Sequence, residues 1–587
     1  MHRRIWLLAG AAVTVLVVAA SAAATSRTVA APAPDVTPAV APFAKAWAKV
    51  PRTPAARAAK KTVVVAMEQD LPGTFNINYT PSNSFWTTNV VTPVLAPVYA
   101  VNDKLTRVPY LITSASADKK GVTYNIRPNA VWNYGGKKIP VTYKDFVATW
   151  KLILNKKNDV VSTAGINQFG SYTHKGDKQV TFLWKKKGCT AAAPCGPFAD
   201  WQDIFGAIYP SFGLNGLSFN SMWAKCICDS SGKLISDGPY YISHYTKGQG
   251  VTENANPLWW GAKQNLTSIN FKLITDTNSE VQAIKGGEVD IANPQPTTAL
   301  STLIGQKGLV YNVKAGLFVE HIDLQEGPTA KSPRVPLMRA PWFRQAIMLS
   351  LDRKGLINAL YQKIAPGLPV MDNLIVFPND KLYKADFAKW NFNQQKAINL
   401  LKAHGCTGGP STPSNGNTNY FTCAGFPAQF AYTTASDNSR RVTSETIFKA
   451  NLAAVGIKVT DNLLPTATMF SDPVLAAGNY DVMEFAWGGV LDYGGNFDIW
   501  GCNGSQNYLH YCNTKVTKYL ADAKTQLNAE KRNADFQAAD ALMGAKDIPA
   551  IPLYDLPTIV TYKTGLSGIT NPATGFTWNT EAWKWKS

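Results

Sequence analysis

The chain has 587 residues, too many for a single hydrophobic core, so its length favours about two to four domains. A hydrophobic content of 45% and a charged content of 17% are typical of a folded globular protein and exclude a largely disordered one. The formal net charge is +19, and residues 1–61 supply +8 of it, with nine Lys and Arg against one Asp. The remaining +11 shows no basic stripe interleaved with aromatic residues, which excludes nucleic acid as the expected partner.

The N-terminus has the pattern of an export signal. Arg3 and Arg4 precede an uncharged run from Ile5 to Ala24, and small residues follow. Cleavage near the end of residues 1–24 is favoured, and the alternative is an uncleaved anchor, because about 20 apolar residues can span a bilayer. Residues 25–61 are rich in Ala and Pro without a periodic apolar face, which predicts an extended, disordered, basic tether. Both interpretations place the rest of the chain outside the cytoplasm.

Eight cysteines, an even number in an exported chain, predict disulfides. They lie in four local pairs: Cys189/Cys195, Cys226/Cys228, Cys406/Cys423 and Cys502/Cys512. The last two pairs flank loops and are typical of loop staples. A bridge across one residue would be strained, so Cys226 and Cys228 are alternatively expected to pair with Cys189 and Cys195. Eight cysteines allow 105 connectivities, and the sequence does not choose among them.

The first elements in chain order are a strand and an amphipathic helix. TVVVAMEQ (62–69) is a β-branched run that predicts a buried strand. Residues 143–154 carry apolar side chains at spacings of three and four, which predicts a helix with Thr142 as N-cap and Asp145 near its positive end. SEVQAIKGGEVDIA (279–292) predicts a short helix, ended by Gly286 and Gly287, and then a strand.

The later elements continue this alternation. PWFRQAIMLSLDRKGLINALYQ (341–362) predicts a helix that begins at Pro341 and a second helix capped near Asp352. RRVTSETIFKANLAAVGIKVTDNLL (440–464) predicts a helix closed by Gly456 that leads into a strand. Residues 407–422, rich in Gly, Ser, Asn and Pro, read as a surface insertion. Helices and strands that alternate throughout the chain indicate an α/β class with mixed sheets.

Motifs for catalysis or metal binding are absent from the sequence. No nucleophile elbow, P-loop, dinucleotide fingerprint, zinc-protease or EF-hand spacing occurs, and the six histidines are scattered. The chain is therefore expected to have no cofactor and no obligatory metal. Asp492 and Asp498 lie close together among aromatic residues, which leaves an exported carboxylate-dependent hydrolase of cell-wall glycans or peptides as an alternative function.

Six segments, taken in order, resemble the extracytoplasmic solute-binding proteins of ABC transporters, in the peptide/nickel (oligopeptide-binding) family. The segments are DGPYYISHYTKGQGVTENANPLWWGAKQNLTSINFKLI (237–274), GGEVD (286–290), FRQAIMLSLDRKGLI (343–357), LAAVGIKVTDNLL (452–464), YDVMEFAW (480–487) and IPAIPLY (548–554). The likeness spans roughly residues 62 to 585.

The resemblance implies a three-lobed, hinge-closing α/β fold like that of periplasmic binding proteins, of type II and of the large class with an extra inserted lobe. Lobe I is expected over residues 62–99, 235–325 and 545–587, lobe II over 100–234 and lobe III over 326–544. Closure of lobes I and III by a hinge traps the ligand and produces the form that the membrane permease recognises.

The resemblance also implies the place of the ligand. In oligopeptide-binding members an aspartate–tyrosine pair follows a tryptophan, and that aspartate meets the α-amino group of the peptide. Here Trp487 and the pair Asp492–Tyr493 match, with one residue more between them. A carboxylate in apolar surroundings needs a partner, and a cation on the ligand would supply it. The alternative is that Asp492 caps a turn or meets an internal Lys or Arg.

Glu484 stands where such members can carry a basic residue for the carboxylates of short peptides. An acid there favours a cationic ligand or a longer peptide, and the alternative is that Glu484 faces an internal Arg. Trp487 and Tyr493 are expected to be walls of the cleft. The remaining candidates are Trp86, Tyr240 and Trp500, for which core packing is the favoured alternative, and Glu68, which is expected near the cleft at the end of the first strand. Arg344, Asp352 and Arg353 are interpreted as structural.

The function that follows is a binding protein, not an enzyme. It is expected to be a monomer that captures a peptide or another small solute with a cationic group and delivers it to an ABC permease and ATPase complex. Nickel is disfavoured, because no histidine falls in a matched binding motif. A sensory or adhesive protein on the same fold stays open as an alternative.

Overall fold

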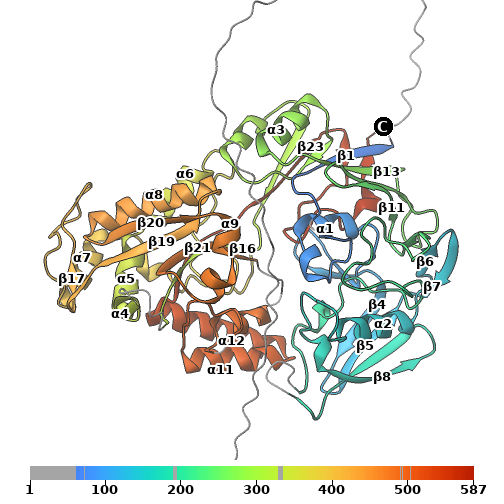
Figure 1. Cartoon of the computed structure of the whole chain (residues 1–587), viewed down its shortest axis with the longest axis horizontal. Coiled ribbons are helices and arrows are strands. Elements are labelled where there is room, and N and C mark those ends of the chain that lie inside the picture. The colour runs from blue at the N-terminus through green and yellow to red at the C-terminus, as the bar shows by residue number, and fades with distance from the viewer. Residues whose placement is uncertain are drawn as a thin grey trace, which may run out of the picture. The chain divides into compact units, whose positions relative to one another are not determined.

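A computed structural model describes residues 61–71, 73–189, 195–327, 335–488, 491, 493–502 and 504–586 of the chain (Figure 1). The expected leader, nearly all of the expected tether and Asp492 lie outside the described residues. The described part contains several mixed sheets with helices between their strands, which confirms the α/β class. Within it, no helix combines the length and the apolar character needed to cross a membrane.

The largest sheet has seven strands, and its central strand β1 is parallel to both of its neighbours, β13 and β14. The other pairs in this sheet are antiparallel. In spatial order its strands are β11 (Tyr240–Thr246), β12 (Gly250–Ala255), β13 (Ser268–Leu273), β1 (Thr62–Met67), β14 (Ile291–Ala292), β23 (Thr558–Lys563) and β15 (Leu309–Lys314). Strands from both ends of the described chain therefore meet in one sheet.

The second large sheet has five strands, with β19 parallel to β20 and β21, and β16 antiparallel to β21 and β22. Its order is β20 (Lys458–Leu464), β19 (Gln429–Ala435), β21 (Val482–Gly488), β16 (Phe318–Leu324) and β22 (Ala550–Asp555). Helix α8 (Ser439–Ala454) packs along β19 and β20 on one face, as Figure 1 shows. This sheet carries the site described below.

The residues between β1 and β11 build smaller antiparallel sheets of their own. One has four strands, β4 (Ile112–Ala117), β5 (Gly121–Ile126), β9 (Gln179–Trp184) and β8 (Phe169–Lys175). Another has three, β10 (Ile235–Ser236), β6 (Val131–Tyr134) and β7 (Lys137–Pro140). Two-stranded pairs complete the described strands: β2 (Tyr99–Val101) with β3 (Arg107–Pro109), β17 (Thr422–Cys423) with β18 (Phe426–Pro427), and β24 (Leu566–Ser567) with β25 (Lys584–Trp585).

The other α-helices in the described residues are α1 (Phe85–Val91), α2 (Tyr143–Ile153), α3 (Thr277–Gly286), α4 (Val335–Met338), α5 (Pro341–Ser350), α6 (Arg353–Tyr361), α7 (Gln394–Ala403), α9 (Thr466–Met469), α10 (Asn496–Trp500), α11 (Thr514–Thr525) and α12 (Ala529–Leu542). Helices α11 and α12 pack against each other beside the five-stranded sheet (Figure 1).

The elements predicted from local patterns are confirmed. Strand β1 is buried, and α2 begins with the predicted cap, in which Thr142 and Asp145 form a reciprocal capping box. Helix α3 ends at Gly287, whose left-handed backbone (φ 81°) closes the helix before β14. Helix α5 begins with Pro341 at its first position, and the Asp352 side chain accepts a hydrogen bond from the Gly355 N–H at the start of α6.

Two arginines act as structural ties, as predicted. Arg344 of α5 is 2% exposed and donates hydrogen bonds to the carbonyl oxygens of Asp547 and Met338. Arg353 of α6 donates to the carbonyl oxygen of Pro552 in β22 and to the Asp372 carboxylate at 2.7 Å. Both guanidinium groups therefore hold helices against the chain that enters and forms β22.

All four disulfides join cysteines that are neighbours in the sequence. Cys406–Cys423 closes the base of the Gly/Ser/Asn-rich insertion and Cys502–Cys512 staples a loop, as predicted. The expected exchange between the first two pairs is wrong, because Cys189 is bonded to Cys195 and Cys226 to Cys228. The Cα atoms of Cys226 and Cys228 are 5.4 Å apart, which is a separation that a disulfide can span.

The chain passes between the two large sheets at two places. It leaves the seven-stranded sheet after β15 and enters β16 through residues 315–317, and it returns from β22 to β23 through residues 556–557. Strands β16 and β22 thus belong to the five-stranded sheet, although they fall within the segments expected for lobe I. The pairing of β16 with β21 and β22 assigns both strands to this sheet, whereas the division into three lobes, with its boundaries at 325 and 545, stays a prediction.

The two crossings lie side by side. The Leu556 N–H donates to the Phe318 carbonyl at 2.9 Å, and the Phe318 N–H donates to the Asp555 carboxylate at 3.3 Å. Gly316 lies against the Leu556 carbonyl oxygen so closely that a Cβ at position 316 would overlap that oxygen. The approach of the two chain segments therefore depends on glycine at this position.

We expect Gly316→Ala to lower the free energy of unfolding by about 2 kcal/mol or more, because the added methyl group must displace backbone that is fixed on both sides. Urea denaturation measures this value. Gly206→Ala is the matched control, since a Cβ there meets nothing within 4 Å. Equal stability of the two variants would show that the crossings are not tightly packed.

Candidate functional site

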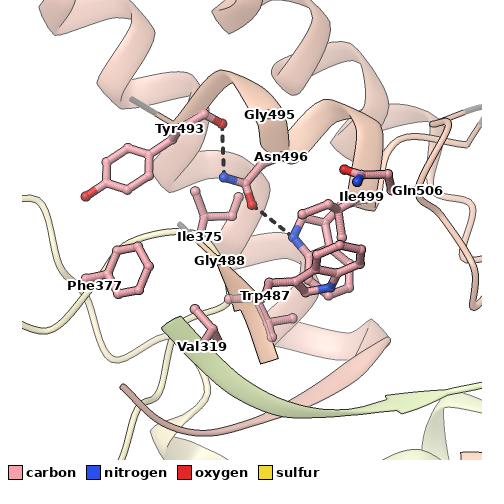
Figure 2. Close-up of a pocket in the computed structure, with 12 residues that line it drawn as sticks. Val319, Ile375, Phe377, Trp487, Gly488, Tyr493, Gly495, Asn496, Ile499 and Gln506 are labelled. Atoms are coloured by element: carbon pink, nitrogen blue, oxygen red, sulfur yellow. Dashed lines mark hydrogen bonds between the residues drawn. The ribbon is translucent and has the colours of Figure 1, made fainter. Parts of the chain in front are cut away.

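An aromatic pocket of about 200 Å³ lies at the end of β21 (Figure 2). The residues that line it come from β16, from a loop after α6, from the end of β21 and from the segment that follows β21. They are Val319, Leu374, Ile375, Phe377, Trp487, Gly488, Tyr493, Gly495, Asn496, Ile499, Trp500 and Gln506. None of these side chains carries a charge. Three of the candidates predicted from the sequence, Trp487, Tyr493 and Trp500, thus meet at one pocket.

The wall of the pocket after β21 is held by an amide. The Asn496 side chain donates to the Tyr493 carbonyl at 3.0 Å and accepts from the Trp500 indole N–H at 3.1 Å, as Figure 2 shows. These bonds fix the short helix α10 and place the Trp500 ring, which is 1% exposed, in the core behind the pocket. Trp500 is therefore chiefly a core residue that also contributes to the lining.

Trp487 differs from Trp500 in its polar group. Its ring stacks near Tyr508, with 5.9 Å between ring centroids, and lies edge to face with Phe485. The indole N–H is buried and has no hydrogen-bond partner among the described residues. A buried donor without a partner is costly, so a carbonyl or carboxylate oxygen on a ligand in this pocket would be stabilised by it.

A second pocket of about 510 Å³ adjoins the first, because Phe377 and Tyr493 line both. It lies between the turn that joins β2 to β3 and the loop 377–381. Its lining is Asp103, Lys104, Leu105, Thr106, Leu317, Phe377, Asn379, Asp380, Lys381, Leu491 and Tyr493. Two carboxylates and two ammonium groups thus surround a space next to an uncharged one.

Tyr493 lines both pockets and forms a hydrogen bond with a charged residue of the second one. Its hydroxyl donates to the Asp380 carboxylate at 2.6 Å, and its ring is almost completely buried. Leu317, from the crossing into β16, contributes to the same lining. The charged pocket therefore touches one of the two chain segments that connect the large sheets.

The alternation of side chains along β21 separates Glu484 from both pockets. Trp487 pairs with Val319 of β16, and both line the aromatic pocket, whereas Glu484 pairs with Ile322 and points to the opposite face. There Glu484 is completely buried and accepts a hydrogen bond from the Tyr432 hydroxyl at 2.9 Å. The structure thus gives Glu484 internal neighbours, and a contact with ligand stays a prediction.

A buried ion cluster surrounds Glu484 on that face. Glu320 of β16 accepts a hydrogen bond from Arg441 of α8 at 2.6 Å and lies 3.6 Å from Arg440. Burial opposes the charge of Glu320, but the two arginines hold its pKa below the ordinary value of 4.5. Burial, together with the negative charge of Glu320, raises the pKa of Glu484 above its ordinary value.

The other candidates lie away from the two pockets. Trp86 of α1 is 3% exposed and packs edge to face against Phe576, and Tyr240 is completely buried in the same core. Glu68 follows β1 and accepts a hydrogen bond from Thr277 at 2.8 Å, and burial raises its pKa. Asp492 lies outside the described residues, but Leu491 and Tyr493 on either side of it both line the charged pocket.

Several lining residues were not found from the sequence. Phe377 and Asp380 lie in an irregular segment, and the turn 103–106 precedes them by more than 250 residues. No periodicity marks such loops. The only signal is the apolar run LIVF (374–377) without strand alternation. Among the residues that the structure describes, no group of three or more His, Cys, Asp or Glu side chains is arranged to hold a metal ion.

Comparisons with known proteins show which protein family the chain matches. Residues 106–508 match the family described as "Bacterial extracellular solute-binding proteins, family 5 Middle". The oligopeptide-binding protein OppA of Mycobacterium tuberculosis is 24% identical over 477 residues, which are 78% of this chain and 74% of that protein. The oligopeptide-binding protein AppA of Bacillus subtilis is 22% identical, over 79% of this chain and 81% of that protein.

Solved structures show the same fold. A periplasmic EDTA-binding protein, EppA, superposes with a TM-score of 0.76 at 21% identity, covering 90% of this chain and 97% of that one. The structure of AppA from Bacillus subtilis in complex with a nonapeptide superposes with a TM-score of 0.69 at 19% identity, covering 90% and 99%. Likenesses below 25% identity establish the fold, and they include proteins with different ligands.

We expect the pH dependence of stability to report on Glu484. In the unfolded chain this carboxyl loses its proton near 4.5, whereas in the folded chain the raised pKa retains the proton. The contribution of Glu484 to the free energy of unfolding is therefore complete below pH 4.5, and it is lost as the pH rises toward the raised pKa of the folded chain. The free energy of unfolding of the wild type should therefore fall between pH 5 and pH 8. In Glu484→Gln this fall should be smaller by on the order of 1 kcal/mol, as measured by urea unfolding at the two pH values.

Glu288→Gln serves as the control for this measurement, because Glu288 is exposed and pairs with Lys272 at the surface. It should leave the slope of stability against pH as it is in the wild type. If Glu484→Gln also leaves the slope unchanged, the carboxyl of Glu484 does not keep its proton on folding.

Proposed function

We propose, on the premise that this chain belongs to family 5 of the bacterial extracellular solute-binding proteins, that it captures a peptide or peptide-like amine and delivers it to an ABC importer. Capture would take place outside the cytoplasmic membrane, and the permease and ATPase complex would receive the closed form. In this proposal the protein acts by binding and not by catalysis.

The observation that carries the choice of ligand is the pair of joined pockets. A peptide combines apolar side chains with a charged amino end, a charged carboxyl end and polar main-chain groups. The uncharged aromatic pocket suits a side chain, and the adjoining pocket offers two carboxylates and two ammonium groups for the charged ends. A purely apolar or a purely anionic solute would leave one of these pockets poorly matched.

Asp492 is proposed to meet the amino group of the ligand. Its neighbours Leu491 and Tyr493 line the charged pocket, and Tyr493 already bonds Asp380 there. A carboxylate among apolar residues is favoured by a cation that comes with the ligand. The unpaired Trp487 N–H would supply a donor for a main-chain oxygen of the same ligand.

Capture requires that the cleft can open, and the two adjacent crossings at 315–317 and 556–557 support a hinge. Their few residues connect the two large sheets, and Leu317 lines the charged pocket. A rotation at these crossings would change that pocket directly, so ligand binding and closure would be coupled. Relatives and neighbours named for oligopeptides and for EDTA show that one fold serves different solutes.

We expect Asp492→Asn to weaken the binding of peptides with a free amino end at least tenfold, because a neutral amide cannot pair with the ammonium group. Isothermal titration calorimetry with a pool of tri- to pentapeptides, once free and once N-acetylated, measures the effect. The wild type should prefer the free pool, and the variant should lose this preference.

Asp498→Asn is the matched control, since Asp498 lies on α10 beside Lys524 and lines neither pocket. It should bind like the wild type. Identical binding by wild type and Asp492→Asn would remove the amine anchor from the proposal. Turnover of the peptides that depends on either aspartate would replace a binding protein with a hydrolase.

We also expect Trp487→Ala to weaken peptide binding more than Trp487→Phe does. The alanine variant loses the aromatic wall, whereas the phenylalanine variant keeps a ring and loses only the N–H donor. Trp342→Ala is the control, because Trp342 stacks on His404 away from both pockets. If Trp487→Ala binds as tightly as this control, the aromatic pocket is not part of the ligand site.

A further inference from the structure

The positive charge of the folded chain is concentrated in residues 100–234. This stretch holds 18 Lys and Arg against eight Asp and no Glu, a net charge of +10. Residues 62–587 together carry +11, so the rest of that part is almost neutral. One quarter of the chain thus carries nearly all of the excess positive charge of residues 62–587.

Several acidic residues of this stretch have partners within the fold. Asp203 forms an ion pair with Arg107 at 2.5 Å, and Asp145 is buried in the cap of α2. Asp229 accepts the Tyr134 hydroxyl at 2.6 Å and backbone N–H groups of its turn. Arg127, the second arginine, donates to the carbonyl oxygens of Tyr110 and Pro109. Among the described residues of the stretch, the ion pair with an acid thus uses an arginine and not a lysine.

The lysines, by contrast, face solvent. Sixteen of the 18 basic residues are Lys, and 14 of these are exposed. Among the described residues, none of the 16 forms an ion pair. The other two, Lys178 and Lys185, are half-buried, and Lys178 donates to the carbonyl oxygens of Ala130 and Val141. Repulsion between so many like charges costs stability, which is unexpected in a surface that only needs to be soluble.

Five of these lysines gather at one end of the four-stranded sheet, and we call them the sheet-end lysines. They are Lys119 and Lys120 in the turn between β4 and β5, and Lys185, Lys186 and Lys187 directly after β9. The register brings the two segments together, since Gly121 pairs with Leu183 and the Trp184 N–H donates to the Lys120 carbonyl at 3.0 Å. The one acid in the turn, Asp118, accepts the N–H groups of Lys120 and Gly121.

We propose that the sheet-end lysines dock the protein on an anionic lipid surface. Lysine ammonium groups near a negatively charged leaflet each contribute attraction without needing a fixed partner. A turn and a strand end at one end of a sheet can meet a flat surface from outside. The basic residues 1–61 have the same sign of charge and would be drawn to the same surface.

The chemistry of the stretch argues against a nucleic acid. Recognition of single strands uses exposed aromatic rings for stacking, and phosphate recognition favours arginine. In the described part of residues 100–234, the one large hydrophobic side chain that is exposed is Val161, and both arginines have partners inside the fold. The surface therefore offers positive charge without aromatic rings for stacking, and an array of anionic lipid headgroups can bind such a surface.

The test is cosedimentation of the full chain with vesicles of 30% phosphatidylglycerol in phosphatidylcholine, against vesicles of pure phosphatidylcholine. One variant replaces all five sheet-end lysines with Gln. The matched control replaces five exposed lysines elsewhere with Gln, namely Lys247, Lys263, Lys307, Lys402 and Lys531. Both variants carry the same net charge and keep residues 1–61, so any difference between them comes from the position of the lysines.

Each lysine near an anionic leaflet contributes about fivefold in partition coefficient, so losing the five contacts weakens binding on the order of 1,000-fold. We expect that loss for the sheet-end variant on anionic vesicles, a small loss for the control, and no binding to pure phosphatidylcholine. Equal losses in the two variants would overturn the proposal, because net charge alone would then explain binding. Tighter binding to single-stranded DNA or to poly-glutamate than to anionic vesicles would overturn it as well.

Discussion

The chain crosses between its two largest sheets at two short segments, and these segments stay hydrogen-bonded to each other. Residues 315–317 and 556–557 run side by side, with the Leu556 N–H on the Phe318 carbonyl and the glycine at 316 permitting the close approach. On either side of the crossings the strands also pair, β15 with β23 in one sheet and β16 with β22 in the other. A rotation of one sheet relative to the other therefore requires a backbone change in these few residues. The same residues border the charged pocket through Leu317.

The five-stranded sheet then divides its chemistry between two faces. Strand alternation sends Glu320 and Glu484 toward α8, where Arg440 and Arg441 compensate the charge of Glu320 and burial raises the pKa of Glu484. The same alternation sends Trp487 to the opposite face, next to Val319 at the aromatic pocket. A polar network on one face thus fixes the strand that presents the aromatic wall on the other. This explains why two residues only three apart in a proposed binding motif have different surroundings.

Local patterns predicted much of the fold. The cap at Thr142, the proline at the start of α5 and the Gly287 stop are encoded by neighbours in sequence, and each was found where the residues indicated. Prediction failed where distant segments decide. The sequence could not assign β16 and β22 to their sheet, choose the partners of Cys226 and Cys228, or show that Phe377 and the turn 103–106 meet Tyr493. Those outcomes depend on packing between segments far apart in the chain.

The sequence by itself determined the α/β class, the export signal that it predicts, the family resemblance and the concentration of lysines in residues 100–234, since each is a property of residue order and composition. Tertiary structure alone decided which candidates share a pocket. Trp487, Tyr493 and Trp500 come together because β21 ends beside α10, whereas Trp86 and Tyr240 are enclosed in another core and Glu484 is turned inward by strand parity. Side-chain identity sets what a residue can bind, but the sheet on which it lies and the face to which it points set whether a ligand can reach it.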